Sequence, residues 1–272
     1  MKNLFSLFGS FLIVVSMSFM ACEKTPTNEV QAPTTDTSVG TYAKNSSNPY
    51  DNAGAEHNTY LDQTLKENFK DLSLTRDQAF QKAFEAYAQT NPPSYITYDS
   101  IYVRNKTLFD GLRTTNDPTT YLTNNGLGSV AARYVASMLD SLSPTGSTTP
   151  RTSQTVCASI KILETDILSN STVPDQDKAI ILSAASVLRH SYCYWEANGP
   201  KWALSFQEAG QSGTATASWW DVAKEDGKGA VSGGIGGAAA GAAAGGAGAV
   251  PGAAVGAAAG AVGASLASAI FD

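Results

Sequence analysis

The sequence predicts an all-α protein, in which a helical domain of five to seven helices is followed by a hairpin of two Gly/Ala-rich helices. Three observations support this fold class. Apolar residues recur every three or four positions, with little of the alternation that marks strands, and helix-capping signals punctuate the region from 49 to 226. Residues 227–272 hold 14 of the 24 glycines, and residues 229–271 contain no charged side chain.

The composition excludes several function classes. Only 15% of the 272 residues are charged, compared with roughly 25% in an average soluble domain, and the net charge is -6. Lys and Arg form no cluster, so we expect no nucleic acid partner, because phosphate binding requires a basic surface. Three Cys and two His lie far apart, and no nucleophile elbow or phosphate-binding glycine loop occurs. We therefore expect no metal, no cofactor and no catalytic residue.

The first 21 residues have the pattern of a secretion signal, with a positive charge at Lys2, an apolar run, and a small residue, Ala21, before Cys22. This end resembles the lipobox of bacterial lipoproteins, although two positions carry bulkier side chains than that family prefers. The resemblance implies that Cys22 becomes the first residue of the mature protein and carries acyl chains such as palmitate. It also implies a lipid-anchored location in the bacterial cell envelope, at the outer membrane, on a face that the sequence leaves open. A plain signal peptide with a chance Cys is the alternative.

Residues 22–48 are rich in Thr, Asn, Ser and Pro and hold hardly any large apolar side chain, so we expect a disordered tether. The helical domain then spans 49–226. Asn48, Pro49 and Asp51 suit the N-cap, the first position and the first turn of a helix. The apolar stripe of this helix has a spacing of four and consists of Ala53, His57, Leu61, Leu65 and Phe69.

A second helix is predicted from Thr75, which forms a capping box with Gln78, to about Thr90. Its apolar positions are Ala79, Phe80, Ala83, Phe84 and Tyr87. Further helices are expected over 96–111, 127–142, 152–169 and 175–196. Residues 96–104 also have β-branched and aromatic character, and residues 197–220 are expected to be irregular.

Cys157 and Cys193 fall on the last two of these helices, which a short polar turn joins into an antiparallel pair. Helical rise places them roughly 20 and 27 Å from the turn. Outside the cytoplasm a disulfide can form across such a pair. The sequence leaves two interpretations open, a disulfide or two buried thiols.

Residues 48–58, NPYDNAGAEHN, resemble an N-terminal motif of the form NPYDxxGxxHN in uncharacterised lipoproteins of the Bacteroidota. That family has no established activity to carry over. The residues could form a site in which Asp51 orients His57 as an acid or base beside Tyr50. We favour a structural role, because His57 lies on the apolar stripe and helix capping explains the Asn-Pro-Tyr-Asp run.

Residues 227–272 form the expected glycine-zipper hairpin. Two series of glycines recur every four residues, and each would line one face of a helix so that another helix can approach closely. The series are Gly229, Gly233, Gly237, Gly241 and Gly245, then Gly248, Gly252, Gly256 and Gly260. Pro251 lies near the start of the second series, so we expect helices over 229–249 and 252–271 with a hinge at 249–252. In water, each glycine disfavours an isolated helix by about 1 kcal/mol.

The tail resembles the glycine-zipper segments of bacterial surface antigens and class II bacteriocins in its repeated GxxxG pattern and Ala filling. This resemblance implies insertion into a lipid bilayer or self-assembly. A bilayer would favour the helical form, because backbone groups must be paired in hydrocarbon. Three states stay open: a hairpin associated with a membrane, a hairpin packed within the protein, or a disordered tail. Trp219 and Trp220 are either an interfacial anchor or part of the domain edge.

Together these inferences predict a non-enzymatic cell-envelope lipoprotein, whose tail associates with a lipid bilayer or joins copies of the chain into a homo-oligomer. The first alternative is a membrane-active, bacteriocin-like toxin that uses the same hairpin. The second is a small hydrolase or ligand-binding domain centred on the NPYD motif and His57.

Overall fold

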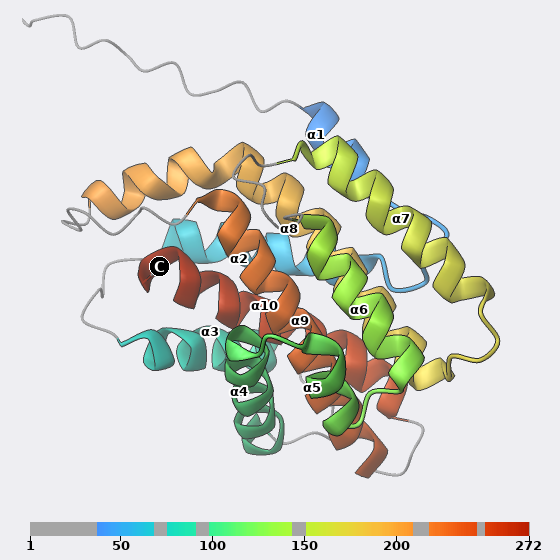
Figure 1. The fold of residues 1–272 in the computed structure, drawn as a ribbon. Coiled ribbons are helices and arrows are strands. Elements are labelled where there is room, and N and C mark those ends of the chain that lie inside the picture. Colours follow the sequence, from blue (N-terminus) through green and yellow to red (C-terminus); the bar gives the residue numbers. More distant parts are fainter. Residues whose placement is uncertain are drawn as a thin grey trace, which may run out of the picture. The chain divides into compact units, whose positions relative to one another are not determined.

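A computed structural model describes residues 37–67, 75–90, 98–142, 151–208, 218–243 and 248–271. Within these ranges the chain forms ten helices and no strand, which confirms the all-α class (Figure 1). The helices are α1 (Thr37–Ala43), α2 (Asn52–Glu67), α3 (Arg76–Thr90), α4 (Tyr98–Thr114), α5 (Pro118–Asn124), α6 (Ser129–Leu142), α7 (Ser153–Ser169), α8 (Asp175–Glu208), α9 (Trp219–Ala243) and α10 (Ala249–Phe271). All ten belong to one unit, Thr35–Asp272.

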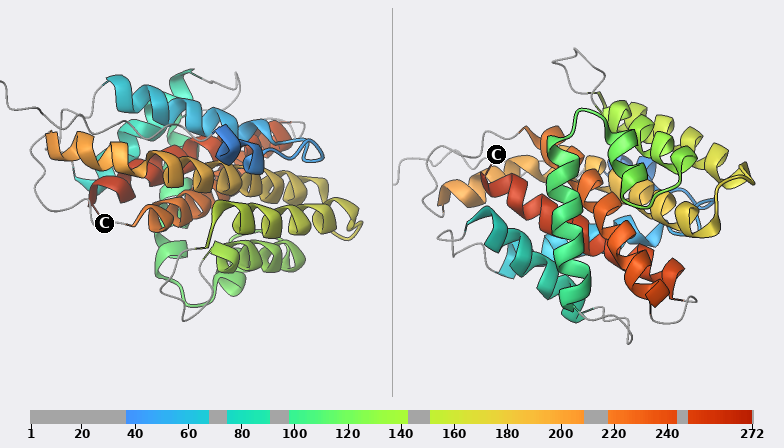
Figure 2. Two further views of the ribbon diagram at one scale, coloured as in Figure 1. Left: turned by 90° about the horizontal axis from the view of Figure 1, so that it is seen from above. Right: turned by 60° about the horizontal axis from the view of Figure 1, so that its bottom comes forward.

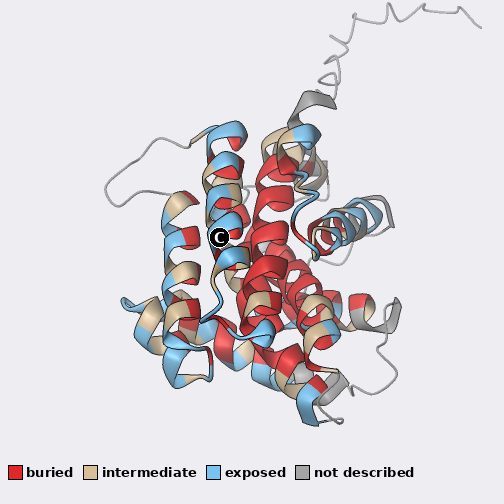
Figure 3. Cartoon of the chain, turned by 90° about the vertical axis from the view of Figure 1, so that its right-hand side faces the viewer, coloured by how far each residue is buried: buried red, intermediate tan, exposed pale blue. Residues whose placement is uncertain are grey.

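Helices α9 and α10 form an antiparallel hairpin inside this unit. They contact each other along their length and also contact α8, while α4 packs on α9 and α2 and α3 pack on α10. Figure 2 shows α4 crossing the hairpin, and Figure 3 shows the buried residues gathered on the inner ribbons, whereas outer helices keep an exposed side. Buried residues run without interruption from Gly256 to Ala269. Residues 229–238 are buried as well, so these two stretches of the charge-free segment are packed within the protein.

Glycines make the contact between α9 and α10. Four glycines of α9 face three of α10 and the residue just before it, in antiparallel order, and we call these eight residues the glycine face: Gly229 with Gly260, Gly233 with Gly256, Gly237 with Gly252, and Gly241 with Gly248. A Cβ atom added to Gly233 would overlap with the carbonyl oxygen of Gly256 and lie 3.1 Å from Cα of Gly260. The two backbones touch, so a side chain on this face would force the helices apart. Gly245 lies outside the described residues.

The bounds of the hairpin differ from the expected ones. The boundary expected between residues 226 and 227 lies inside α9, which begins at Trp219. The hinge expected at 249–252 lies inside α10, where Pro251 occupies the first turn. Proline is tolerated there because amides of the first turn have no acceptor within the helix. Trp219 packs edge to face against Tyr192 of α8, at 5.0 Å between ring centroids, so it belongs to the packing between α8 and α9.

The capping box at the start of α3 is confirmed. The Thr75 N–H donates to Oε1 of Gln78 at 2.8 Å, and the Gln78 N–H donates to Oγ1 of Thr75 at 3.3 Å. All five predicted apolar residues of this helix are buried. A Cβ on Gly263 would lie 3.0 Å from the ring of Phe80, so α3 packs directly on the backbone of α10. Residues 98–104, which also had strand character, belong to α4.

The start of α2 needs correction. This helix begins at Asn52 rather than beside Asn48, which lies in a turn before the helix and bonds to α8. Oδ1 of Asn48 accepts a hydrogen bond from the Tyr50 N–H at 2.8 Å, and its Nδ2 donates to the carbonyl of Leu182 at 2.8 Å. The stripe residues Ala53, His57 and Leu61 are buried as predicted. Leu65 and Phe69 lie outside the part of the chain whose side chains are described.

The tether expected over 22–48 is wrong for its last residues. Thr37–Ala43 forms α1, Ala43 is buried beside two cysteines, and Asn48 is only 3% exposed. A polar composition does not prevent order here, because Asn45 and Asn48 both donate to the buried carboxylate of α7 at Glu164. The structure does not describe residues 22–36.

Two helices go beyond the expectation. Helix α5 was not predicted, although Asp117 caps it by accepting a hydrogen bond from the Thr120 N–H at 3.0 Å. The predicted end of α8 near residue 196 is wrong, because this helix continues past Pro200 to Glu208. Trp202 is 1% exposed and belongs to the hydrophobic core, so tertiary packing holds the helix beyond the proline.

Candidate functional site

The motif that begins at Asn48 attaches the start of α2 to α7 and α8. Glu164 of α7 and Arg189 of α8 are both fully buried. Nη2 of Arg189 lies 2.9 Å from Oε1 of Glu164 and 2.6 Å from Oδ1 of Asp51. Nδ2 of Asn48 donates to Oε1 of Glu164 at 2.7 Å. A buried charge is costly unless it is paired, so these contacts hold the motif against both helices.

The rest of the motif lies against α8. A Cβ on Gly54 would lie 2.5 Å from the carbonyl oxygen of Ser186 and 2.7 Å from Cβ of His190, so only glycine fits. The Gly54 N–H donates to Oγ of Ser186 at 3.0 Å, and that hydroxyl donates to the carbonyl of Asp51 at 2.8 Å. Nδ2 of Asn58 donates to the carbonyl of His190 at 2.9 Å. Spacings of three and four residues put these groups on one helix face.

Burial and nearby charges set the protonation of this cluster. Burial lowers the pKa of His190 to about 4, although the neighbouring carboxylate of Asp51 acts in the opposite sense. Burial alone would raise the pKa of Asp51, but the N–H of Asn45 and the guanidinium of Arg189 hold it below its usual value. At neutral pH the cluster therefore contains an ionised Asp51, a cationic Arg189 and an uncharged His190.

A second polar cluster joins α2, α8, α9 and α10, and we call it the buried relay: His57, Ser191, Trp195, Asp226 and Ser265. Oδ2 of Asp226 accepts hydrogen bonds from the Ser191 hydroxyl and from Nε1 of Trp195, the latter at 2.8 Å. Oγ of Ser265 lies 2.5 Å from Oδ1 of Asp226 and 3.1 Å from Nε2 of His57. Each of the five residues is at most 2% exposed.

Hydrogen-bond partners and burial together favour the uncharged forms of His57 and Asp226 in the relay. Oδ1 of Asn58 lies 3.0 Å from Nδ1 of His57 and, as an acceptor, requires the ring proton to be on Nδ1. Ser265 has only one hydroxyl proton for its contacts with Nε2 of a neutral His57 and with Asp226. A protonated Asp226 satisfies both contacts, because it donates to Ser265 while Ser265 donates to His57. Burial raises the pKa of Asp226 to about 7, although its three hydrogen-bonding partners act in the opposite sense. Burial also lowers the pKa of His57 to about 4.

The residue types of the relay occur in nucleophilic active sites, but their arrangement here differs. In a Ser-His-Asp site the carboxylate binds Nδ1 of the histidine, while the serine oxygen faces the substrate. In this protein Asp226 lies on the Nε2 side of His57, at 3.7 Å, and Ser265 is fully buried between them. The hydrolase hypothesis requires an accessible His57, whereas the described structure leaves this side chain no exposed surface. The relay fixes helices to one another.

Cys157 and Cys193 lie next to each other on α7 and α8, as the predicted helix pair allows. Their sulfur atoms are 3.6 Å apart, and both thiols are free and buried. Among the described residues, no three His, Cys, Asp or Glu side chains are placed to hold a metal ion. Cys22, the expected lipidation site, lies outside those residues.

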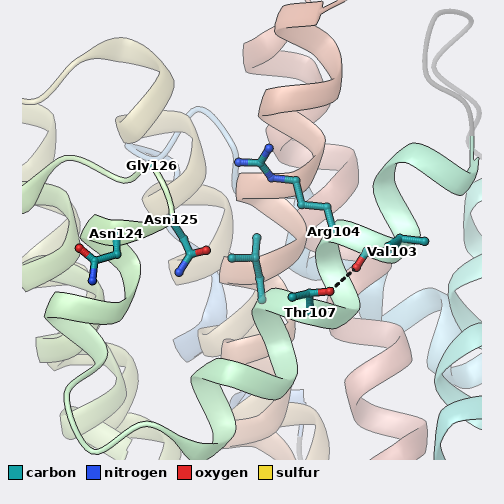
Figure 4. A pocket seen from close by; sticks show the side chains of 7 residues that line it. Val103, Arg104, Thr107, Asn124, Asn125 and Gly126 are labelled. Carbon is teal, nitrogen blue, oxygen red and sulfur yellow. Dashed lines mark hydrogen bonds between the residues drawn. The ribbon is translucent and has the colours of Figure 1, made fainter.

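A pocket of 680 Å³ lies between α4 and the end of α5 (Figure 4). It is lined by Val103, Arg104, Thr107, Leu108, Asn124, Asn125 and Gly126. Arg104 extends into the space between the helices, whereas the Thr107 hydroxyl donates to the carbonyl of Val103 at 2.9 Å within α4. The volume is in the range of small-molecule sites. Arg104 is the only ionisable residue in this lining, so the pocket offers polar recognition but no acid and base pair.

Asp226 and Ser265 were not predicted as partners of His57. One signal was present in the sequence, because Asp226 is the last acidic residue before the charge-free segment. Ser265 gave no signal, since it lies 39 residues from Asp226 and 208 residues from His57 in the chain. The buried pair of Glu164 and Arg189 was missed for the same reason.

Comparisons with protein-family models, with curated proteins and with solved structures each found no match.

Proposed function

We propose that this protein is a non-enzymatic lipoprotein of a bacterial cell envelope, in which lipid on Cys22 holds the helical unit at a membrane and the hairpin of α9 and α10 is the core of that unit. The observation that supports the hairpin as the core is the unbroken burial from Gly256 to Ala269. The lipid anchor on Cys22 is proposed from the signal-like residues 1–21 and the lipobox-like end before Cys22.

The chemistry of the hairpin supports its role as a core. A helix that is covered on all sides must be apolar around its whole circumference, so the absence of charge needs no membrane to explain it. The glycine face serves here as a glycine zipper, because its bare backbone allows the two helices to approach closely. Two buried serines of the hairpin are hydrogen-bonded: Ser232 donates to Oδ1 of Asn105 at 2.7 Å, and Ser265 belongs to the buried relay.

A second candidate function is membrane insertion or self-assembly by the hairpin. Residues Ala249–Ala269 are long and apolar enough to cross a bilayer, which favours this candidate. However, 78% of the apolar window is buried within the unit, and the core helix of a soluble protein has the same length and composition. Insertion would therefore require the hairpin to leave α2, α3, α4 and α8. This toxin-like function needs a released state, whereas the lipoprotein function uses the packed one.

Membrane fractionation of the wild type and of Cys22→Ser tests the proposal. We expect the wild type in the membrane fraction after washing with salt and alkaline carbonate, and Cys22→Ser in the soluble fraction as a monomer. A Cys22→Ser chain that stays in the membrane would show that the hairpin is itself an anchor, and a soluble wild type would exclude lipid on Cys22. Dye release from liposomes by soluble Cys22→Ser protein would favour the second candidate.

A further inference from the structure

Cys157 and Cys193 have the geometry of a thiol pair that can be oxidised. They project from adjacent antiparallel helices with their sulfurs 3.6 Å apart, which is van der Waals contact for two sulfur atoms. A disulfide bond has a length of about 2.0 Å, so closure needs a movement of roughly 1.6 Å, which small shifts of two side chains can supply. The two residues are 36 positions apart, so the bond would tie α7 to α8.

The two sulfurs are not equivalent. The contact between them raises the pKa of Cys157 and lowers the pKa of Cys193. Burial opposes the second shift, whereas a hydrogen bond from Ser153 supports it. Cys193 is therefore the more acidic thiol of the pair and the one that attacks an external disulfide, since the attacking species is a thiolate rather than a thiol.

Helix α1 covers the pair. Ala43 and the two cysteines form one buried apolar cluster, with Tyr42 packed against it, and α1 contacts both α7 and α8. The sulfurs cannot meet an external reagent in this state, because Cys157 is 1% exposed and Cys193 is 4% exposed. With seven residues, α1 is too short to be stable alone, so it can open locally while the rest of the unit stays folded.

We propose that Cys157 and Cys193 are a redox-active thiol pair, which an external disulfide, R–S–S–R, oxidises to an intramolecular disulfide when α1 lifts from α7 and α8. The Cys193 thiolate attacks one sulfur of R–S–S–R, a mixed disulfide forms, and one RS⁻ leaves and takes up a proton. Cys157 then loses its proton and attacks the Cys193 sulfur, which releases the second RSH. The protein loses two protons and two electrons, and the external disulfide gains them.

The test exposes folded protein carrying Cys22→Ser, which leaves only these two thiols, to oxidised glutathione. The sample is then unfolded and treated with iodoacetamide, which alkylates free thiols, and its mass is measured by mass spectrometry. We expect loss of both alkylation adducts and a monomer lighter by two hydrogens. Cys157→Ser and Cys193→Ser are the controls, and neither can form the internal bond. Two alkylated thiols, a lasting glutathione adduct on the two-thiol protein, or a disulfide-linked dimer would each overturn the proposal.

The role of α1 is tested by two substitutions with opposite expected effects on the oxidation rate. Ala43→Asp places a carboxylate against the sulfurs and should speed oxidation at least about tenfold by displacing α1. Gly40→Ala adds a Cβ that meets nothing within 4 Å and favours the helix, so it should slow oxidation about fivefold. Equal rates in both variants and the parent would show that α1 does not control access. Far-UV circular dichroism confirms that each variant is folded.

Discussion

Replacing Gly233 with alanine should destabilise the protein, whereas the same change at the neighbouring Gly234 should not. Both glycines are buried in α9, and at either one alanine favours the helix by about 1 kcal/mol. The two positions differ in what a Cβ would meet. At Gly233 it overlaps with the carbonyl oxygen of Gly256 and lies 2.8 Å from the carbonyl carbon, whereas at Gly234 the nearest atom is a methyl of Ile180 at 3.2 Å.

The magnitude follows from this geometry. Two carbon atoms are comfortable at about 3.5–4.0 Å, so Gly233→Ala must separate α9 from α10 by roughly 1 Å, and neither backbone can rotate away. Overpacking of this kind costs about 1–3 kcal/mol or more, and the separation also weakens contacts at neighbouring glycines. After subtraction of the gain in helix propensity, we expect a net loss of about 2 kcal/mol. Gly234→Ala should lie within about 0.5 kcal/mol of the parent, since the Ile180 methyl has to shift only slightly and the gain in helix propensity offsets that cost.

Urea unfolding followed by circular dichroism, in the Cys22→Ser background, measures both variants. A difference of about 2 kcal/mol corresponds to a lowering of Tm by roughly 4–8 °C for a unit of this size. Similar free energies of unfolding for Gly233→Ala and Gly234→Ala would mean that the two glycine series do not touch. Close approach of the two backbones would then be refuted.

Three other outcomes are expected. The pKa of His57 in the folded protein is about 4, below its ordinary 6.5, so the neutral side chain contributes stability that is complete above pH 6.5 and is lost as the pH falls toward 4. His57→Gln should therefore reduce the slope of the unfolding free energy by about 1.4 kcal/mol per pH unit within that window, and an unchanged slope in urea titrations would contradict the burial of the relay. Arg189→Met should cost about 3–5 kcal/mol, because it leaves Glu164 buried without a cation, and adding Glu164→Gln should recover part of this loss in the same assay. Oxidation of the cysteine pair should raise the free energy of unfolding by about 3–4 kcal/mol, because the disulfide closes a long loop. Equal urea midpoints of the oxidised protein with and without dithiothreitol would contradict this expectation.

Local signals in the sequence predicted most of the helices. Thr75 and Gln78 form their capping box because its bonds join residues only three apart, and the spacing of Ala53, His57 and Leu61 placed one face of α2 in the core. The end of α8 could not be predicted this way. Pro200 signals a stop, but the packing of Trp202 outweighs that signal, and packing is absent from any local pattern.

The candidate sites depend even more on tertiary structure. The motif residues Asp51 and Gly54 were recognisable, but a capping role was the simplest local interpretation, and their partners on α8 are more than 100 residues away. The glycine series were visible as a pattern that favours close helix packing. Composition alone could not decide whether hydrocarbon or the other helices cover them, because both require the absence of charge.

Hydrogen–deuterium exchange of the Cys22→Ser protein in plain aqueous buffer measures whether the charge-free hairpin is the core of the folded unit. With α10 buried from Gly256 to Ala269, we expect these amides to exchange as slowly as those at the centre of α8, through global unfolding alone. Exchange of these amides at the rate of an unfolded peptide, while α8 remains protected, would contradict the burial of the hairpin beneath the other helices.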